Sequence, residues 1–295
     1  MCDAPRSVSL DASLLVELGS VADESALRQF LAVRLLYPSN PLQGREPEEQ
    51  YAEEYSIAGQ LGFERSLFSF EGFMADEFRM IPSPSRSELI LYRGWMMKPP
   101  HYTELHRTLI GLGAVPLTTP QQYQLCHYLP EWYEILKELT SETRFFDEND
   151  DMVAELQRLG WKGCFLKDYV KSVSAEGGGM ARELDQIPTV IARMKKFRGE
   201  IEGGICARRI EDFEAGSEER HFVFRGKAFS RTGSAPAMVA TAAERIASPF
   251  FSVDTAVRTD GVIRIVELGD GQVSDLKQWP AQRFLELLRE NVADT

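Results

Sequence analysis

The chain has 295 residues, of which 43% are hydrophobic and 26% charged, the composition of an ordinary globular protein. The net charge of −12 argues against duplex nucleic acid as a main partner, because phosphate neutralisation needs clustered Lys and Arg. The four cysteines form no CxxC pair, so a zinc site or disulfide framework is not expected and a reducing cytoplasm is the expected location. The sequence has no signal-peptide pattern and no apolar run of membrane-spanning length, so no membrane partner is expected.

The first half of the chain alternates strand-like and helix-like segments. After a polar helical leader expected at residues 1–29, strands are predicted at 31–37, 63–70, 88–93 and 114–117, and helices at 47–61, 99–112 and from 120 onward. Proline opens the first of these helices and Gly62 follows it, as is typical of helix ends. Strands that alternate with helices of this length predict a parallel sheet.

The pattern changes near residue 140, where we place the boundary between an N-terminal α/β domain (30–140) and a second region (141–295). In the second region, strands are predicted at 163–169, 204–210, 220–224 and 227–230, and helices at 184–197, 237–247 and 280–292. We expect this region to be mostly antiparallel with helices on one side. The predicted fold class is therefore α/β, with an α+β C-terminal half.

A hairpin near the C-terminus is the most informative segment. The dipeptide Asp260–Gly261 between two β-branched, apolar arms predicts a two-residue type I′ turn. Such a turn pairs Thr259 with Val262. Continued along the arms, this register places Asp254 directly opposite Glu267.

Two carboxylates in directly opposed positions destabilise a strand pair, so Asp254 and Glu267 predict a cation between them. Ligands that are all oxygen, and that leave room for water and phosphate, suit Mg²⁺. The alternative is a pair of exposed acids on a solvated face. Ile263 and Ile265, expected on that same face, make it partly apolar and favour the metal site.

Lys167 ends an apolar strand, where a lysine is costly unless it meets an anion. The glycines Gly177, Gly178 and Gly179 follow within a dozen residues, and such a loop can bring backbone N–H groups close to phosphate oxygens. The spacing is not that of a Walker motif. A flexible linker is the alternative interpretation of the three glycines.

Three arginines have positions that suit anion binding. Arg208 ends one predicted strand and Arg220 begins the next, and arginine is the natural bidentate partner of phosphate or carboxylate. The alternative for each is a surface salt bridge. Arg93 follows a strand of the expected parallel sheet, at the end where ligands bind, so it is predicted to contact an anionic co-substrate.

The order of these parts resembles the ATP-grasp superfamily. That family has a preceding α/β domain, a strand lysine and a glycine-rich loop for the nucleotide phosphates, a strand leading to an adenine-binding hinge, and paired acids for Mg²⁺. The chain is most similar to the clade of predicted ligases named for two arginines and a lysine, whose positions match Arg208, Arg220 and Lys167. The resemblance covers about residues 30–290 and includes 91–96, 126–130 and 267–274.

The resemblance implies an ATP- and Mg²⁺-dependent ligase that activates a carboxylate as an acyl phosphate and joins it to an amine or similar nucleophile. The co-substrates would be small molecules, peptides or proteins. An ATP-dependent phosphotransferase and a non-catalytic nucleotide-binding module remain the alternatives.

The resemblance also implies residue roles. Lys167 and the glycine loop would hold the phosphates, Arg208 and Arg220 would act on the charge that develops during transfer, and the nucleotide-binding hinge would be Arg209, Ile210 and Glu211. Asp254 and Glu267 would bind the metal. Many ATP-grasp enzymes have Asn two residues after the metal Glu, where this chain has Gly269, so Asp270 or Asp275 is expected to supply the missing oxygen.

Overall fold

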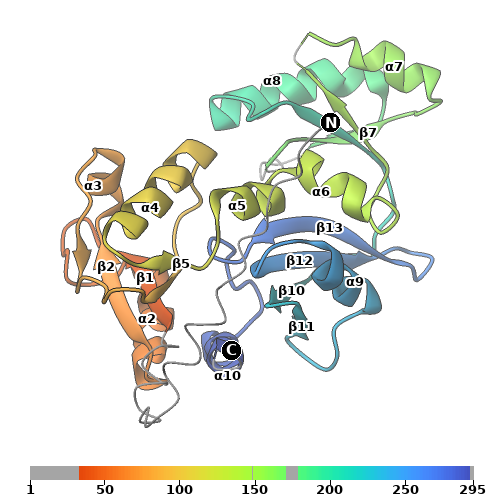
Figure 1. Ribbon diagram of the computed structural model, residues 1–295. Helices are drawn as coiled ribbons and strands as arrows, with labels where there is room; N and C mark the ends of the chain where they lie inside the picture. The colour runs from red at the N-terminus through yellow and green to blue at the C-terminus, as the bar shows by residue number, and fades with distance from the viewer. Residues whose placement is uncertain (1–32, 148, 171–178, 293–295) are drawn as a thin grey trace, which may run out of the picture.

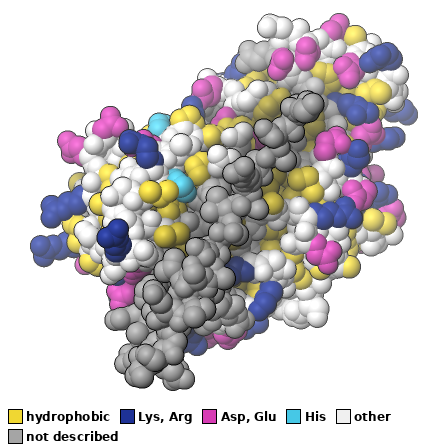
Figure 2. Space-filling view, in the orientation of Figure 1, with side chains coloured by type: hydrophobic (Ala, Val, Ile, Leu, Met, Phe, Trp, Pro, Cys, Tyr) yellow, Lys and Arg dark blue, Asp and Glu magenta, His cyan; other side chains and the backbone are white. Residues whose placement is uncertain are grey.

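The computed structural model describes residues 33–147, 149–170 and 179–292, which form three sheets with helices around them (Figure 1). The leader expected at residues 1–29 lies outside these ranges. Within them, no helix is both long enough and apolar enough to cross a membrane. On the face seen in Figure 2, basic and acidic side chains are interspersed rather than gathered by sign.

The N-terminal sheet has the strand order β3-β2-β1-β4-β5. Its strands are β1 (Val33–Pro38), β2 (Glu64–Phe68), β3 (Met80–Ile81), β4 (Leu89–Tyr92) and β5 (Val115–Pro116). Strand β1 is parallel to β2 and β4, and β5 is parallel to β4, which confirms the predicted parallel sheet. Only the edge strand β3 is antiparallel, and its two residues are too few to give a sequence pattern.

The helices of this half are η2 (Glu49–Tyr51), α2 (Ala52–Gln60), α3 (Phe70–Met74), α4 (Pro99–Gly111), α5 (Pro120–His127) and α6 (Leu129–Leu136). The helices predicted at 47–61, at 99–112 and from 120 onward are confirmed, whereas the short helix α3 was not predicted. Gly62 and Gly113 follow α2 and α4 with left-handed φ angles of 84° and 81°, which explains why glycine ends both helices. Helix α5 begins with a capping box formed by Thr119 and Gln122.

The central sheet is antiparallel, with the order β11-β10-β12-β13. It contains β10 (Glu219–Phe224), β11 (Lys227–Ser230), β12 (Phe250–Val257) and β13 (Ile263–Asp270), followed by α10 (Ala281–Val292), and α9 (Ala237–Arg245) lies between β11 and β12. Side chains of one face, such as Val253 and Leu268, form a core with α5, α6 and α9. On the other face Phe222 and Phe250 pack with Phe284 of α10 and with Leu35 of β1, so the C-terminal helix joins the two halves.

The third sheet has the order β6-β9-β7-β8 and is also antiparallel. Its elements are β6 (Thr143–Phe146), α7 (Met152–Arg158), β7 (Cys164–Asp168), β8 (Met180–Ala181), η3 (Leu184–Gln186), α8 (Ile187–Arg198) and β9 (Ile205–Arg209). Leu166 and Ala207 face α7 and α8 in a separate core. Because side chains alternate along a strand, Lys167 and Arg208 then point to the opposite face of this sheet.

The β12–β13 hairpin pairs Asp254 with Glu267, as predicted, but its turn differs from the prediction. Arg258 N donates to Val262 O at 2.8 Å, so the loop has three residues, and Gly261 is the only one of them with a positive φ. A type I′ turn needs two such residues, so the two-residue type I′ turn is wrong.

A β-bulge restores the predicted pairing. Thr255 pairs with Ile265 and Asp254 with Glu267, which leaves Val266 as an extra residue on β13. The extra residue in the loop and the one in the bulge therefore cancel. The bulge also pairs Ile263 with Val257 and Ile265 with Thr255, so both lie on the opposite face and the expectation that they share a face with Asp254 is wrong. Ile265 lies in the core there.

One buried arginine clamps the two halves of the chain together. Arg93, only 2% exposed, donates from Nε and Nη2 to the two carboxylate oxygens of Glu54 in α2, at 2.8 and 2.9 Å. Its Nη1 donates to the carbonyl oxygens of Gly271, Gln272 and Ser274, at 2.6, 3.2 and 3.1 Å. We call these contacts the Arg93 clamp. They join the end of β4 to the loop after β13.

A second polar contact lies beside the clamp. Asp270 is fully buried, and its Oδ1 accepts hydrogen bonds from the backbone N and side-chain Nε2 of Gln272, both at 3.0 Å. Gln272 Nε2 also donates to the Tyr102 hydroxyl at 2.8 Å. Asp270 Oδ2 has no hydrogen-bond partner among the described residues. Burial raises the pKa of Asp270 to about 7, and the bonds from Gln272 offset this only in part.

The clamp predicts a large stability loss for Arg93→Met. Removing one partner of a buried ion pair leaves a buried charge, Glu54, without compensation and costs about 3–5 kcal/mol of unfolding free energy. Urea denaturation measures this loss. Arg107→Met is the control, because Arg107 pairs with Glu104 on the exposed surface of α4, and we expect it to cost less than about 1 kcal/mol. Equal losses in the two variants would show that the clamp does not hold the halves together.

Asp270 predicts a pH-dependent change in stability. Its folded-state pKa of about 7 lies above the ordinary value of 3.8, so the folded state takes up the proton first. The stability that Asp270 contributes is therefore full below about pH 4 and is lost as the pH rises towards 7. Asp270→Asn cannot lose this proton, so its Tm relative to the wild type should be higher at pH 8 than at pH 5. The exposed Asp185→Asn is the control, and a Tm difference that does not change with pH for Asp270→Asn would contradict the assignment.

Candidate active site

One row of charged side chains crosses the central sheet. The register pairs Arg220 of β10 with Asp254 of β12, and Asp254 with Glu267 of β13, so all three side chains lie side by side on one face. Further along the same face the residues are aromatic, such as Phe222 and Phe250. The polar row therefore lies at one end of a face whose other end belongs to the core.

Asp254 is the most enclosed member of the row, with 1% of its surface exposed. Its Oδ1 accepts a hydrogen bond from Arg220 Nε at 2.7 Å, and its Oδ2 accepts from Arg220 Nη2 at 2.7 Å and from Lys277 Nζ at 2.8 Å. Burial alone would raise the pKa of Asp254, but these two cations lower it below its ordinary value. Arg220 Nη1 donates to Asp275 Oδ1 at 2.6 Å, which fixes the guanidinium at a second point.

Glu267 connects the row to the third sheet. Lys167 Nζ, from β7, donates to Glu267 Oε1 at 2.8 Å across 100 residues of sequence. Lys167 is 4% exposed, whereas 37% of the Glu267 side chain is exposed. The two opposed acids are thus compensated by side-chain cations: Arg220 and Lys277 at Asp254, and Lys167 at Glu267.

Arg208 is a buried cation without a carboxylate partner among the described residues. Its Nη1 donates to Val266 O at 2.6 Å and its Nη2 to Thr140 Oγ1 at 2.6 Å, while Nε has no partner in the described structure. Burial lowers the pKa of Arg208, and the nearby charge of Glu267 offsets this only in part. A guanidinium that is buried at this cost and keeps an unused donor suits an anionic ligand.

The predicted hinge lies at the edge of the site. Arg209, Ile210 and Glu211 line a cavity of about 450 Å³ together with residues at the tip of the hairpin, such as Thr259 and Asp260. Glu211 Oε2 accepts from Arg264 Nε at 3.3 Å. Arg209 is exposed and pairs with Glu142 at 3.2 Å. Nucleotide binding by these three residues stays a prediction.

Two of the three predicted loop glycines, Gly177 and Gly178, lie outside the described residues. Gly179 is described and has a clear packing reason for being glycine: a Cβ there would lie 1.8 Å from Leu166 O. Leu166 N donates to Gly179 O at 2.7 Å, so the close approach belongs to the pairing of the chain with β7. A phosphate contact from this loop stays a prediction.

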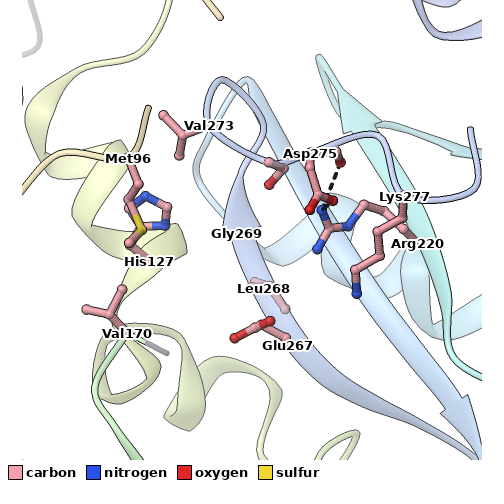
Figure 3. A pocket seen from close by; sticks show the side chains of 11 residues that line it. Met96, His127, Val170, Arg220, Glu267, Leu268, Gly269, Val273, Asp275 and Lys277 are labelled. Atoms are coloured by element: carbon pink, nitrogen blue, oxygen red, sulfur yellow. Dashed lines mark hydrogen bonds and ion pairs between the residues drawn. The ribbon is translucent and has the colours of Figure 1, made fainter. Parts of the chain in front are cut away.

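A cavity of about 280 Å³ opens beside the charged row (Figure 3). Arg220, Lys277 and Asp275 lie on one side of it with Glu267 close by, and the opposite side is formed by Met96, His127 and Val170. Met96 follows β4 and His127 ends α5, so the cavity lies where the N-terminal half meets the central sheet.

Sequence reasoning missed Lys277. It follows β13 in a loop, where no alternation of strand residues marks it, and its left-handed φ of 44° is an unusual conformation for a lysine. It missed Met96 and Val170 for the same reason, because both lie in loops that follow strands. Only the folded structure brings these residues to one cavity.

Two predicted site residues lie elsewhere. Arg93, predicted to bind substrate, uses its guanidinium donors in the Arg93 clamp and is buried, so that prediction is corrected to a structural role. Asp270, predicted as third metal ligand, is on the opposite face of β13 from Glu267 because three positions separate them along the strand. In the described part of the chain, no group of three or more acidic, His or Cys side chains is arranged to hold a metal.

Four cations and two carboxylates form the inner part of the site. The cations are Lys167, Arg208, Arg220 and Lys277, and the carboxylates are Asp254 and Glu267; Asp275 lies at the rim with 78% of its side chain exposed. The inner groups carry an excess of positive charge. Such an arrangement suits a polyanion that brings its own compensating cation.

Comparison with known proteins identifies this arrangement. Residues 135–288 match the ATP-grasp domain of family 3 in the clade named for two arginines and a lysine, and no curated protein matches the sequence. Two solved structures share the fold: a RimK domain ATP-grasp protein from Sphaerobacter thermophilus (TM-score 0.56, 16% identity, 89% of this chain and 96% of that chain) and D-alanyl-alanine synthetase A from Vibrio cholerae (TM-score 0.59, 12% identity, 90% and 99%).

A third similar structure is the ATP-grasp ligase PsnB in complex with a minimal precursor, Mg and ADP (TM-score 0.55, 10% identity, 89% of this chain and 98% of that chain). The matched residues 135–288 make up more than half of the chain and contain Lys167, Arg208, Arg220, Asp254 and Glu267. The protein therefore belongs to the ATP-grasp superfamily, in family 3 of the two-arginine, one-lysine clade.

Proposed function

We propose that this protein is an ATP- and Mg²⁺-dependent ligase that activates a carboxylate as an acyl phosphate and joins it to an amine or similar nucleophile. One observation carries the proposal. Two buried cations from two facing sheets, Lys167 and Arg220, bind Glu267 and Asp254 beside a cavity at the junction of the two halves, and the buried Arg208 binds the backbone of Val266, next to Glu267. Phosphoryl transfer needs such positioning and charge compensation more than it needs a protein nucleophile.

The two carboxylates fit Mg²⁺. This ion prefers oxygen ligands and is usually bound by one or two carboxylates together with substrate phosphates and water. Asp254 and Glu267 are directly opposite each other and both supply oxygens, so they would hold the ion. Bound there, it would neutralise charge on the phosphates during transfer.

In the first step, an oxygen of the substrate carboxylate attacks the γ-phosphorus of ATP, and ADP leaves. Lys167 and Arg208 would bind and orient the phosphates, and the free Nε of Arg208 gives a donor for an oxygen of the transferred group. Arg220 is held in place by Asp254 and Asp275, so its charge is fixed before the reaction begins. Fixed charges of this kind stabilise a transition state without reorganisation.

In the second step, the amine nitrogen attacks the acyl carbon, and inorganic phosphate leaves with one oxygen from the original carboxylate. The cavity wall opposite the charged row contains Met96, Val170 and Val273 and is apolar apart from His127. An apolar wall lowers the amount of water near a reactive acyl phosphate and so favours the amine over hydrolysis.

Two of the similar structures support the reaction class. One is named a D-alanyl-alanine synthetase and another an ATP-grasp ligase in complex with a precursor, Mg and ADP. On that basis the co-substrates we propose are amino acids or peptides. The shared fold alone does not select between them.

The test is a screen for ADP release with pooled carboxylates and amines, followed by oxygen tracing. With an ¹⁸O-labelled carboxylate, an acyl phosphate mechanism transfers one ¹⁸O to inorganic phosphate and gives an amide product, both measurable by mass spectrometry. Glu267→Gln is the control and should release no ADP above background. A stable phosphorylated product would instead identify a phosphotransferase, and nucleotide binding without ADP release from any pool would identify a non-catalytic module.

Arg208 predicts a kinetic effect that is separable from stability. Loss of a fixed charge that acts on the transferred group should lower kcat by about 10²–10³-fold, with a much smaller change in KM for ATP. We therefore expect Arg208→Met to lose activity while it melts close to the wild type, because burial of this cation is itself costly. Arg144→Met, on the neighbouring strand β6, is the control because Arg144 is half-exposed and pairs with Glu142. Wild-type kcat in Arg208→Met would remove Arg208 from the active site.

A further inference from the structure

Lys277 has a position that the proposed chemistry does not yet explain. It lies in the loop between β13 and α10 with a left-handed φ of 44°, and its side chain lines the cavity (Figure 3). Its Nζ donates to Asp254 Oδ2 at 2.8 Å and also contacts Glu218. A lysine therefore donates a hydrogen bond to one of the carboxylate oxygens that we propose to hold Mg²⁺.

The two cations on Asp254 are held very differently. Arg220 is 9% exposed, makes a two-point contact with Asp254, and is tied to Asp275 at 2.6 Å. The backbone of the same residue accepts a bond from Trp279 Nε1 at 2.8 Å. Lys277 touches Asp254 through a single atom, and a quarter of its side chain is exposed. Lys277 is thus the donor that can leave Asp254 at the smaller cost.

Among the described residues, no third acid joins Asp254 and Glu267 in a group that could hold a metal, and Asp275 at the rim already accepts a bond from Arg220. Asp270 is on the opposite face of β13, and Gly269 has no side chain. A Cβ at Gly269 would lie 2.8 Å from Ser274 Oγ and 3.0 Å from Ser252 Oγ, so the packing leaves little room for a ligand there. A metal ion at this site must use Asp254, and so must compete with its present donors.

We propose that Lys277 is a placeholder cation: it compensates Asp254 while the metal is absent, and it moves to the phosphates of the nucleotide when the metal binds. The proposal rests on the metal site of the proposed function. The ammonium is released next to the cavity that Lys277 already lines, so its movement is a change of hydrogen-bond partner and needs no backbone rearrangement.

This exchange makes metal and nucleotide binding cooperative through one side chain. The metal competes with Lys277 for Asp254 when nucleotide is absent, and the released ammonium then becomes a phosphate donor. Because coupling of two binding events is reciprocal, bound nucleotide must also favour metal binding by the same factor. Lys277 would then be a positioning residue for the metal and a binding residue for the nucleotide.

The first experiment measures binding without turnover, so it stands whether or not the ligase reaction is correct. In Lys277→Gln, the metal no longer competes with a lysine for Asp254. We therefore expect Mn²⁺ binding in the absence of nucleotide to tighten about fivefold, as measured by electron paramagnetic resonance. The affinity for Mg·ATP, measured by calorimetry, should fall about tenfold, the effect of one lost charge-assisted hydrogen bond. Lys137→Gln, an exposed lysine of the segment after α6, controls for removing one positive charge and should change neither.

The second experiment uses the wild-type protein and so does not depend on how the variant folds. Brief acetylation read by peptide mass spectrometry should modify Lys277 faster with saturating Mn²⁺ than without it, and more slowly with Mg·ATP, while Lys137 reacts equally in all three conditions. Unchanged Mn²⁺ affinity in Lys277→Gln, or weaker binding of both ligands, would overturn the proposal in favour of a structural ion pair. Acetylation of Lys277 that does not respond to Mn²⁺ would overturn it as well.

Discussion

The site is organised by one electrostatic constraint, the direct opposition of two carboxylates on neighbouring strands. Asp254 and Glu267 are paired by the ladder itself, so neither can move away from the other without breaking the sheet. Arg220, Lys277 and Lys167 approach them from three different parts of the chain, and each pairs with one of the two acids. The contact between Lys167 and Glu267 is also one of the links that hold the third sheet against the central sheet. The same charges therefore serve the fold and the proposed chemistry.

Much of this arrangement could be predicted from local sequence patterns. The alternation of strands and helices, the glycine that ends a helix, and the charged residues at strand positions all depend on neighbours along the chain. Asp254 opposite Glu267 was predicted correctly although the turn was not, because an extra residue in the loop is cancelled by the bulge at Val266. That agreement rests on two compensating departures from a regular hairpin.

The errors at the turn and at Ile265 are local to the hairpin, but those in the site concern residues whose surroundings come from distant segments. The residues near Arg93 in the sequence do not indicate its partners. Glu54 lies 39 residues away, and the carbonyl groups that Arg93 binds lie about 180 residues away. Asp270 was predicted to bind the metal because it is close to Glu267 in sequence. Side chains alternate along the strand, however, so Asp270 points into the core. Lys277 was missed because a loop residue acquires its neighbours only when the loop closes over Arg220 and Asp254. Long-range packing, rather than local propensity, decides these three cases.

The Arg93 clamp has a mechanical consequence. Separating the N-terminal half from the central sheet would break the three hydrogen bonds from Arg93 Nη1 to the loop after β13. It would also uncover the Arg93–Glu54 ion pair, which lies within the N-terminal half and orients the guanidinium. On the other side of the cavity, the N-terminal half meets the third sheet through the exposed ion pair of Lys98 with Glu200. Two hydrogen bonds add to it, from the Tyr128 hydroxyl to Glu202 Oε1 at 2.5 Å and from Leu129 N to Tyr169 O at 2.8 Å. Because the bonds from Arg93 end at Ser274, next to Asp275, the Arg93 clamp also holds the start of the loop that brings Lys277 to Asp254.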